Sequence, residues 1–330
     1  MTNSPLSIIC DGHNMKILIT GGLGFIGHNV ANILESLGHD IVIVDNKSTY
    51  GIIPQAELDT IINERLTKIK TKNIIIDAIE CVNNSVFANV DLVIHLASFP
   101  RQKVVNQNPQ LGSRVMSEGL LNLLELSKKN NVKRFVYISS SMVYGDFNTL
   151  DGVVESAICN PIGQYSIMKL AGEWLVQDYY RSSRLNYTII RPSAVYGPLD
   201  VEDRVVSKFL LSAMRSATLN VNGINDELDF SYVDDVALGI AMASISTNTL
   251  NNIYNISRGE SHSLLSAANL AIQVVGQGQL NIRDRENNYP HRGRLNITKA
   301  VRDFNYYPKT NIFDGFVKYH QWLKNTQGNK

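Results

Sequence analysis

The chain has 330 residues, 44% of them hydrophobic, which is enough to bury the core of one large domain or of two closely joined lobes. Its 31 basic and 30 acidic residues leave a net charge of +1, and neither a basic run nor an acidic tail points to a nucleic-acid partner. No apolar stretch reaches the roughly 18 residues expected of a membrane-spanning helix, so the composition argues against a membrane protein.

The cysteines and the N-terminus both favour a cytoplasmic location. Cys10, Cys81 and Cys159 are far apart, odd in number and without metal-ligand spacing, which is typical of free thiols in a reducing compartment. Residues 1–14 are polar and lack the basic start and apolar centre of a signal peptide. We therefore expect no metal site, and either a flexible N-terminal extension or translation that starts at Met15.

Strand-like apolar runs alternate with helical patterns through about the first 190 residues. This alternation predicts a parallel sheet with helices on both faces, the doubly wound arrangement of a Rossmann domain, over residues 15–192. The predicted strands are 16–20, 40–45, 72–77, 90–97, 134–139 and 187–191, and the predicted helices are 26–37, 56–68, 111–130 and 162–184.

The last third of the chain has shorter elements, separated by Asn- and Gly-rich turns. Patterns at 205–217, 233–246 and 264–275 predict helices. We expect residues 193–330 to form mainly a smaller C-terminal α/β lobe that binds substrate, with some segments returning to the first domain. In open α/β sheets ligands lie beyond the carboxyl ends of the strands, so this lobe would close over that edge.

A glycine-rich turn, Thr20–Gly27 with the sequence TGGLGFIG, joins the first predicted strand to the first predicted helix. In such a turn the first glycine permits the tight bend, the second lets the backbone approach a pyrophosphate, and the third lets helix and strand pack closely. The free N–H groups and positive dipole end of the helix then face the phosphates. The alternative is a glycine-rich turn in an unrelated α/β protein, but the surrounding strands and helix favour a dinucleotide site.

Asp45 ends the second predicted strand and indicates which dinucleotide binds. Its carboxylate can accept hydrogen bonds from an adenosine ribose, whereas its charge would repel a 2′-phosphate. The sequence therefore predicts NAD rather than NADP as the cofactor.

Tyr165 and Lys169 open the second long predicted helix, where residues i and i+4 lie on one face. A free phenol is a poor base at neutral pH, but a nearby ammonium and the positive nicotinamide of an oxidised cofactor would lower the pKa of Tyr165. Tyr165 could then remove a proton from a sugar hydroxyl as hydride leaves the same carbon. The spacing alone is common in helices and carries little weight by itself.

A serine-rich run, Ser139–Gly145, directly follows a predicted strand at the edge where ligands bind. A serine hydroxyl there can hydrogen-bond the reacting hydroxyl or carbonyl and orient it toward Tyr165. A plain Ser-rich turn is the alternative for this run taken alone.

With these motifs in order, the chain resembles the extended short-chain dehydrogenase/reductases, specifically the NAD-dependent nucleotide-sugar epimerase/dehydratase group that includes UDP-glucose 4-epimerase. The resemblance covers about residues 15–325. It rests on Thr20–Gly27, Asp45-Asn46, Val93–Ala97, Ser139–Gly145, Tyr165–Lys169, Arg191–Pro198, Asp229–Asp235 and Tyr254–Ile256.

The resemblance implies a Ser/Tyr/Lys catalytic set of Ser140, Tyr165 and Lys169, with Ser141 as the alternative hydroxyl. It also implies a homodimer that pairs the helices around 111–130 and 162–184, and a role in polysaccharide biosynthesis. The cofactor residues expected from the motifs and the resemblance together are Gly21, Gly24, Phe25, Ile26, Gly27, Asp45, Asn46, Asp77, Ala78, Leu96, Ala97, Ser98, Tyr165, Lys169, Pro192 and Ser193.

Several positions depart from the family pattern. Dehydratases of the family usually carry an Asp-Glu pair directly after the catalytic hydroxyl, where this chain has Ser141 and Met142, so 4,6-dehydration is disfavoured. Polar residues that contact the nucleotide sugar in the family are replaced at three further positions: Met116, Ala194 and Leu228.

Two arginines could compensate for these losses. Arg204 falls in the segment that cradles the nucleotide in the family, and Arg292 matches a recurrent phosphate-binding arginine. Guanidinium groups bind a diphosphate in a bidentate manner. Solvated surface charges are the alternative. The expected substrate-binding residues are Ser140, Ser141, Met142, Arg204 and Arg292.

The resulting hypothesis is an enzyme that holds NAD and oxidises C4 of a nucleotide-diphosphate sugar through a 4-keto intermediate, so that hydride return to the other face gives 4-epimerisation. A 4-dehydrogenase or 4-ketoreductase uses the same residues and stays open. A non-catalytic NAD-binding sensor is the alternative of another class. We further expect His95 to pack, His28 to lie at the surface, and Trp174 and Trp322 to be core or interface residues.

Overall fold

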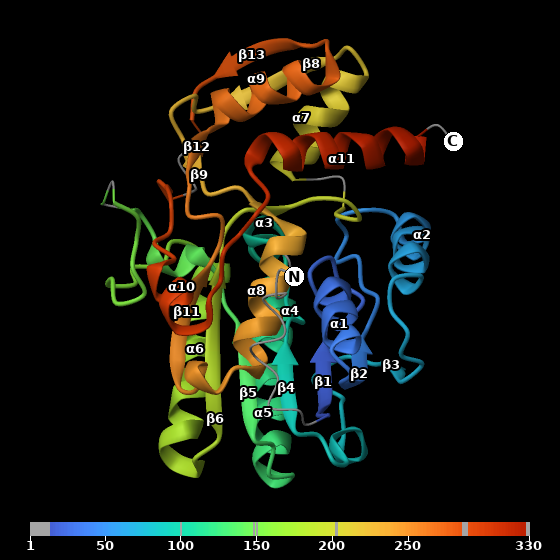
Figure 1. The fold of residues 1–330 in the computed structure, drawn as a ribbon, viewed down its shortest axis with the longest axis vertical. Helices are drawn as coiled ribbons and strands as arrows, with labels where there is room; N and C mark the ends of the chain where they lie inside the picture. Colours follow the sequence, from blue (N-terminus) through green and yellow to red (C-terminus); the bar gives the residue numbers. More distant parts are fainter. Residues whose placement is uncertain are drawn as a thin grey trace, which may run out of the picture.

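The computed structural model describes residues 14–99, 101–147, 149, 151–201, 204–285 and 290–327. Apart from Asn14, the predicted N-terminal extension lies outside the described residues. Figure 1 shows a central sheet with its helices and, above the ends of the strands, a smaller lobe.

Seven parallel strands form the central sheet, in the order β11-β6-β5-β4-β1-β2-β3. This confirms the predicted doubly wound sheet. The chain adds β2 and β3 on one side of β1 and then crosses to add β4 on the other side, which opens a crevice at the carboxyl ends of β1 and β4. The strands are β1 (Lys16–Thr20), β2 (Asp40–Asp45), β3 (Ile74–Ile76), β4 (Leu92–His95), β5 (Arg134–Ile138), β6 (Asn186–Pro192) and β11 (Asn252–Ile256).

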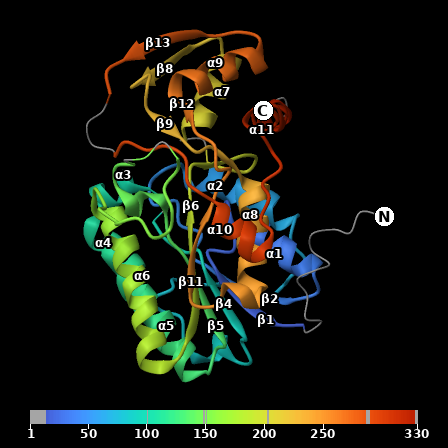
Figure 2. The same cartoon turned by 60° about the vertical axis from the view of Figure 1, so that its left-hand side comes forward.

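Alternate residues of the strands serve two separate cores, as expected of a sheet covered on both faces. In β1, Ile17 and Ile19 pack with α1, α2, α8 and α10, whereas Leu18 packs with α3, α5 and α6. Figure 2 shows these two helix layers with the sheet between them. The helices are α1 (Gly27–Ser36), α2 (Gln55–Leu66), α3 (Gln102–Gln107), α5 (Gly119–Lys129), α6 (Gln164–Ser183), α8 (Val233–Ile245) and α10 (Thr298–Phe304), with the 3-10 turns η2 (Asn84–Phe87), η4 (Ser141–Tyr144) and η5 (Thr247–Thr249).

The helix predicted over 111–130 is not a single regular helix. It consists of α4 (Pro109–Ser113), a π-helical turn η3 (Arg114–Glu118) and then α5. Within this segment Gly119 faces Ile79 so closely that an added Cβ would lie 2.6 Å from the Ile79 side chain. A π turn accommodates one extra residue, which regular helical periodicity does not reveal.

The upper lobe has its own apolar core, formed by helices that pack together over a short strand pair. Phe209, Ala268 and Phe316 lie in this core, one from each of the three helices. Segments after residue 192 also return to the sheet domain, because α8, β11 and α10 all pack there. The lobe and its connections contain α7 (Val205–Met214), α9 (Leu264–Val275), α11 (Ile312–Gln327), β7 (Val195–Tyr196), β8 (Thr218–Asn222), β9 (Glu227–Leu228), β10 (Ser231–Tyr232), β12 (His262–Ser263) and β13 (Gln279–Arg283).

Two histidines show where local pattern and packing differ. His95 is buried at the end of β4 and hydrogen-bonds Thr20, with 2.7 Å between Nδ1 and Oγ1, so its predicted packing role is confirmed. The surface position predicted for His28 is wrong, because only 1% of this residue is exposed and its Nδ1 lies 2.9 Å from the Gly24 carbonyl oxygen. The first turn of α1 is therefore covered by the rest of the molecule on the His28 side.

Candidate active site

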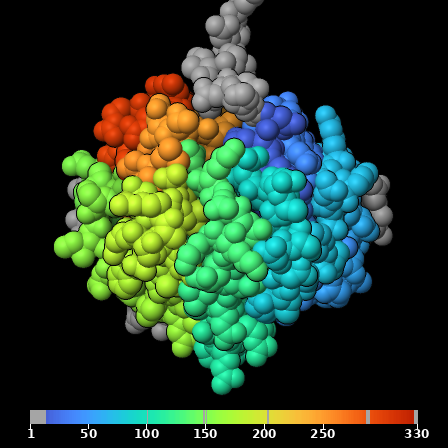
Figure 3. Space-filling view, turned by 90° about the horizontal axis from the view of Figure 1, so that it is seen from below, coloured from blue at the N-terminus to red at the C-terminus, as the bar shows by residue number. Residues whose placement is uncertain are grey.

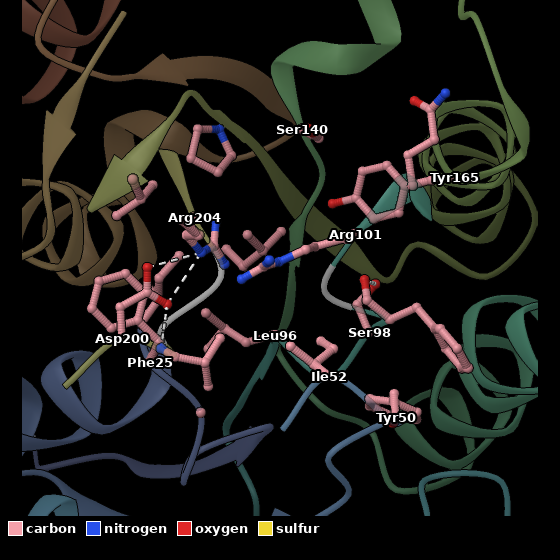
Figure 4. Close-up of a pocket in the computed structure, with 18 of the residues that line it drawn as sticks. Phe25, Tyr50, Ile52, Leu96, Ser98, Arg101, Ser140, Tyr165, Asp200 and Arg204 are labelled. Carbon is pink, nitrogen blue, oxygen red and sulfur yellow. Dashed lines mark hydrogen bonds and ion pairs between the residues drawn. The ribbon is translucent and has the colours of Figure 1, made fainter. Parts of the chain in front are cut away.

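A cavity of about 720 Å³ lies at the carboxyl ends of the strands, between the sheet and the upper lobe. Its size is typical of cofactor and ligand sites. Figure 4 shows Tyr165 and Ser140 on one side of it and Phe25, Asp200 and Arg204 on the other.

The glycine loop forms one wall of the cavity, and backbone atoms surround its glycines closely. Gly21 has φ of +70°, and a Cβ there would lie 2.7 Å from the Ala97 nitrogen. A Cβ at Gly24 would lie 2.9 Å from the Gly21 oxygen, and one at Gly27 would collide with the same oxygen. Helix α1, all of which the structure describes, has no side-chain cap and no acidic first turn. Its N-terminus can therefore receive a phosphate group.

Asp45, the last residue of β2, lies next to the glycine loop in this wall of the cavity. Its Oδ2 accepts a hydrogen bond from the Leu23 amide at 3.0 Å, and its Oδ1 accepts one from the Lys47 amide at 2.8 Å. Burial raises the pKa of the Asp45 carboxyl, and these two amides oppose that rise. Because a carboxylate offers about four acceptor sites, capacity remains for ribose hydroxyls. The glycine cradle and Asp45 thus fit a bound NAD.

Tyr165 and Lys169 lie on α6, and both line the cavity with Ser140, the N-cap residue of η4 two positions after β5. The Tyr165 hydroxyl points into the cavity (Figure 4). Lys169 donates to the Ile138 carbonyl oxygen at 2.7 Å, and its Nζ lies 5.9 Å from the centre of the Tyr165 ring. The backbone of β5 therefore orients the ammonium beside the phenol.

The protonation of this pair differs from the expectation. Burial raises the pKa of Tyr165, and the hydrogen bond with Ser140 opposes that rise. Burial also lowers the pKa of Lys169 to about 7, against the attraction of Glu173. The groups that oppose the rise are Ser140, Arg204 and Arg292 rather than Lys169, and desolvation outweighs them, so the expected lowering of the Tyr165 pKa is not supplied by the protein alone. The positive nicotinamide of NAD would add charge on the side that favours the phenolate.

A buried ion pair between Glu173 and Arg191 lies next to the Ser140, Tyr165 and Lys169 group. Glu173 follows Lys169 by one turn, and its carboxylate accepts from Arg191 Nη2 at 2.6 Å, from Arg191 Nε at 2.9 Å and from the Ser139 hydroxyl at 2.5 Å. These contacts tie the ends of β5 and β6 to α6. Glu173 was not predicted as a site residue, although it follows Lys169 at the i+4 spacing that places two side chains on one helix face.

Nearly all predicted cofactor residues line the cavity; Ala78 and Ser193 are the exceptions. The Ala78 amide donates to the neighbouring Asp77 carboxylate at 2.8 Å. Ser193 is buried, and its hydroxyl has no hydrogen-bond partner among the described residues. Asp77 and Pro192, the residues directly before these two, line the cavity.

The predicted substrate residues Ser141, Met142, Arg204 and Arg292 also line the cavity. Arg204 pairs with Asp200 at 2.9 Å, and its guanidinium carbon lies 5.8 Å from the centre of the Phe25 ring. The placement of both arginines at the cavity favours the binding interpretation over a solvated surface charge.

Sequence reasoning missed several lining residues: Tyr50, Arg65, Arg101 and Asp200. The i,i+4 spacing of Asp200 and Arg204 was a signal for that ion pair. Arg65 gave none, because a charged residue on a predicted helix is usually solvated. Tyr50 lies in an irregular stretch, where its ring sits 4.2 Å from that of Phe99.

The fold and this cavity define an enzyme of the Rossmann type that works with a bound dinucleotide. Residues 17–257 match the model of the NAD dependent epimerase/dehydratase family. The chain belongs to that family, as predicted, and is an NAD-dependent enzyme of the extended short-chain dehydrogenase/reductase type.

Three similar proteins match this chain over almost their whole length. A putative UDP-glucose 4-epimerase of Methanocaldococcus jannaschii is 30% identical over 318 residues, which cover 94% of this chain and 98% of the relative. The crystal structure of UDP-glucuronic acid 4-epimerase from Bacillus cereus, in complex with UDP-glucuronic acid and NAD, is 25% identical with a TM-score of 0.87, covering 94% of this chain and 100% of that one. UDP-glucose 4-epimerase from Thermotoga maritima, with UDP-glucose, is 25% identical with a TM-score of 0.83, covering 95% and 100%.

None of the helices in the described ranges combines the length and apolarity needed to cross a bilayer. Within the same ranges, no group of three or more His, Cys, Asp or Glu side chains is placed to hold a metal ion.

Proposed function

We propose that the protein is a nucleotide-sugar 4-epimerase. The observation that carries the proposal is the meeting of Ser140, Tyr165 and Lys169 across one cavity from the glycine loop. The relatives named above as 4-epimerases of UDP-sugars support it.

Each catalytic side chain has a distinct task in this proposal. When bound, NAD supplies the hydride acceptor for C4 of the sugar and then the donor for the opposite face. Tyr165 accepts the proton of the C4 hydroxyl and later returns it, and Ser140 orients the same oxygen through its hydroxyl. Lys169, fixed by the Ile138 carbonyl, places its amino group beside the phenol, and the protonated form of Lys169 favours the phenolate. Free rotation of the sugar between the two steps is what separates an epimerase from a 4-dehydrogenase or 4-ketoreductase.

The two positions after Ser140 favour epimerisation over dehydration. Ser141 and Met142 are both buried in η4, and neither carries a carboxylate. Water elimination from the sugar requires an acid close to the leaving hydroxyl. The chain therefore lacks, at these positions, the group that dehydration needs.

A panel of UDP-sugars, including UDP-glucose and UDP-glucuronic acid, tests the proposal. The purified protein with NAD should form a C4 epimer without net NADH, as followed by NMR and absorbance. Stoichiometric NADH would instead identify a 4-dehydrogenase, and a 4,6-dehydrated product would contradict the interpretation of Ser141 and Met142.

We also propose that two copies pair through α5 and α6, which lie side by side on one surface in Figure 3. Large apolar side chains are exposed there: Leu121 at 39%, Ile167 at 52% and Trp174 at 60%. Clustered exposed apolar residues are typical of protein–protein interfaces. Light scattering should give the mass of a dimer, and Trp174→Glu should give that of a monomer. A monomeric wild-type protein would contradict this part of the proposal.

A further inference from the structure

One arginine joins the glycine loop to the upper lobe. Arg65 lies near the end of α2 and is only 3% exposed. Its Nη1 donates to the Leu23 carbonyl oxygen at 2.7 Å, and its Nη2 donates to the Leu199 carbonyl oxygen at 2.7 Å. Leu23 belongs to the glycine loop, whereas Leu199 belongs to the loop that leads into α7. A single guanidinium thus bridges the cofactor wall and the first segment of the lobe.

The Leu199 end of this bridge has an unfavourable backbone conformation. Leu199 has φ of +65°, in the left-handed region that leucine rarely adopts, and its side chain is buried. Such conformations persist where surrounding contacts enforce them, and they cluster at functional sites. The hydrogen bond from Arg65 to the Leu199 carbonyl is a contact that enforces it directly.

Asp200, which directly follows Leu199, connects the Arg65 bridge to a side chain of the cavity. Asp200 is buried, and its Oδ1 accepts a hydrogen bond from Arg204 Nε at 3.1 Å, while its Oδ2 lies 2.9 Å from the same nitrogen as an ion pair. The Arg204 guanidinium in turn lies over the Phe25 ring, in the glycine loop, as Figure 4 shows. The contacts therefore connect Leu23 to Phe25 of the same loop by way of Arg65, the Leu199–Asp200 segment and Arg204. We call this set of contacts the circuit.

The charges around this circuit are consistent with an anion site. Burial raises the pKa of Asp200, and Arg204, Arg101 and Arg65 oppose that rise. Burial lowers the pKa of Arg65 to about 10, against the attraction of Asp200 and Asp45, so Arg65 remains charged at neutral pH. Asp200 therefore faces more positive than negative charge.

We propose that Arg65 is a positioning residue that couples dinucleotide binding at the glycine loop to anion binding by Arg204. Ordering of the loop by NAD stabilises the Arg65 bridge, and the bridge holds Leu199 and Asp200 so that Arg204 faces the cavity. Coupling between two sites is reciprocal, so a bound anion also tightens NAD binding. The identity of the anion as the diphosphate of a nucleotide sugar rests on the proposed function.

Calorimetry with UDP as the probe, with and without NAD, tests this coupling. Wild-type protein should bind UDP more tightly when NAD is present. In Arg65→Gln the affinity for UDP in the presence of NAD should fall about tenfold, the effect expected when a charged hydrogen-bonding group is lost, and most of the NAD dependence should disappear. The ammonium of Arg65→Lys lacks the fork that reaches both carbonyls, so the UDP affinity of this variant should lie between those of wild type and Arg65→Gln. Arg65→Lys replaces Arg65→Gln in the test if the glutamine variant does not fold.

A double-mutant cycle separates positioning from general stability. Arg204→Ala should weaken UDP binding strongly when it is introduced into the wild-type protein. It should have little effect when introduced into Arg65→Gln, because Arg204 is already misplaced in that variant. Glu64→Gln is the matched control, since Glu64 neighbours Arg65 but accepts from Trp322 of α11 rather than bonding either loop. Arg215→Gln, at an exposed position after α7, controls for the loss of one positive charge. Additive effects of Arg65→Gln and Arg204→Ala would overturn the proposal.

Hydrogen exchange gives a readout that does not depend on the substrate. NAD should slow amide exchange at residues 197–201 in the wild type, and much less in the Arg65 variants. Unchanged exchange at these residues in the wild type would overturn the coupling. Failure of wild-type protein to bind UDP, with the NAD effect on exchange intact, would count against the nucleotide-sugar proposal and leave the Arg65 bridge standing.

Discussion

The sheet domain and the upper lobe hold their cavity side chains in different ways. In the sheet domain Lys169 stands on a 20-residue helix and bonds a strand carbonyl, and Tyr165 stands one turn away. On the lobe side Arg204 stands at the end of a loop and bonds another side chain, Asp200. In the proposed function, the groups that would meet the reacting atom are fixed by backbone and regular elements, whereas the arginine that would bind the ligand depends on a loop and an ion pair.

Removal of the phenol hydroxyl should have the largest effect. Tyr165→Phe should lower kcat by about 10²–10⁴-fold, because no other positioned group replaces the proton acceptor. NAD affinity should stay within about twofold of wild type, since the ring remains. Turnover and NAD titration measure the two quantities. Substantial turnover in this variant would mean that Tyr165 is not the proton acceptor. The contrast drawn above between the sheet domain and the upper lobe would then be wrong.

Gly27→Ala should be next in magnitude. The added Cβ would meet the Gly21 carbonyl oxygen, and both groups belong to the backbone, so the loop must shift. An overpacked site of this kind should weaken NAD binding by about 10–100-fold. Gly293→Ala is the control, because its Cβ would lie 3.8 Å from the nearest side-chain atom, in Phe147. Equal losses in both variants would mean that the cradle has no special role.

Arg204→Ala should mainly affect binding. KM for the nucleotide sugar should rise about tenfold, whereas kcat should change only a few-fold, because Arg204 grips a part of the ligand that does not react. Steady-state kinetics beside Arg215→Ala measure this. A fall in kcat comparable with that of Tyr165→Phe would show that the lobe takes part in the chemistry as well as in binding.

Stability should also depend on pH through Lys169. The pKa of Lys169 falls from 10.5 to about 7 on folding because of burial. Between these values the unfolded chain binds a proton that the folded chain has lost, so the free energy of unfolding gains up to about 1.4 kcal/mol per pH unit as pH rises from 7 toward 10. Below pH 7 the burial penalty is fully present.

Urea denaturation at pH 7 and pH 9 measures this contribution. Lys169→Met should lack it, so its stability should rise less between the two pH values than that of wild type. Lys70→Met, at an exposed position, is the control and should behave as wild type. A parallel response of wild type and Lys169→Met would mean that Lys169 keeps its proton in the folded protein.

Local patterns predicted the sheet because its strands are continuous apolar runs next to amphipathic helices. They also located the glycine loop and Asp45, whose physical requirements are local. They did not predict the π turn at Arg114–Glu118, the burial of His28 or the bridge at Arg65. Each of these depends on contacts between segments far apart in sequence, such as Arg65 with Leu199. The short strands β8 and β13 alternate between polar and apolar residues, but each has only five residues and two apolar side chains, too few for the pattern to stand out.

The strand β11, which comes last in the sequence of the sheet, leaves its partner β6 unpaired during much of the synthesis of the chain. β11 pairs with β6 but is separated from it by most of the first half of the lobe, since the register joins Asn252 to Thr188. Until residue 256 leaves the ribosome, the outer side of β6 is an open edge with unpaired amides and carbonyls. A chain that stops before β11 would thus expose the edge of an apolar strand to other nascent chains and should be prone to aggregation.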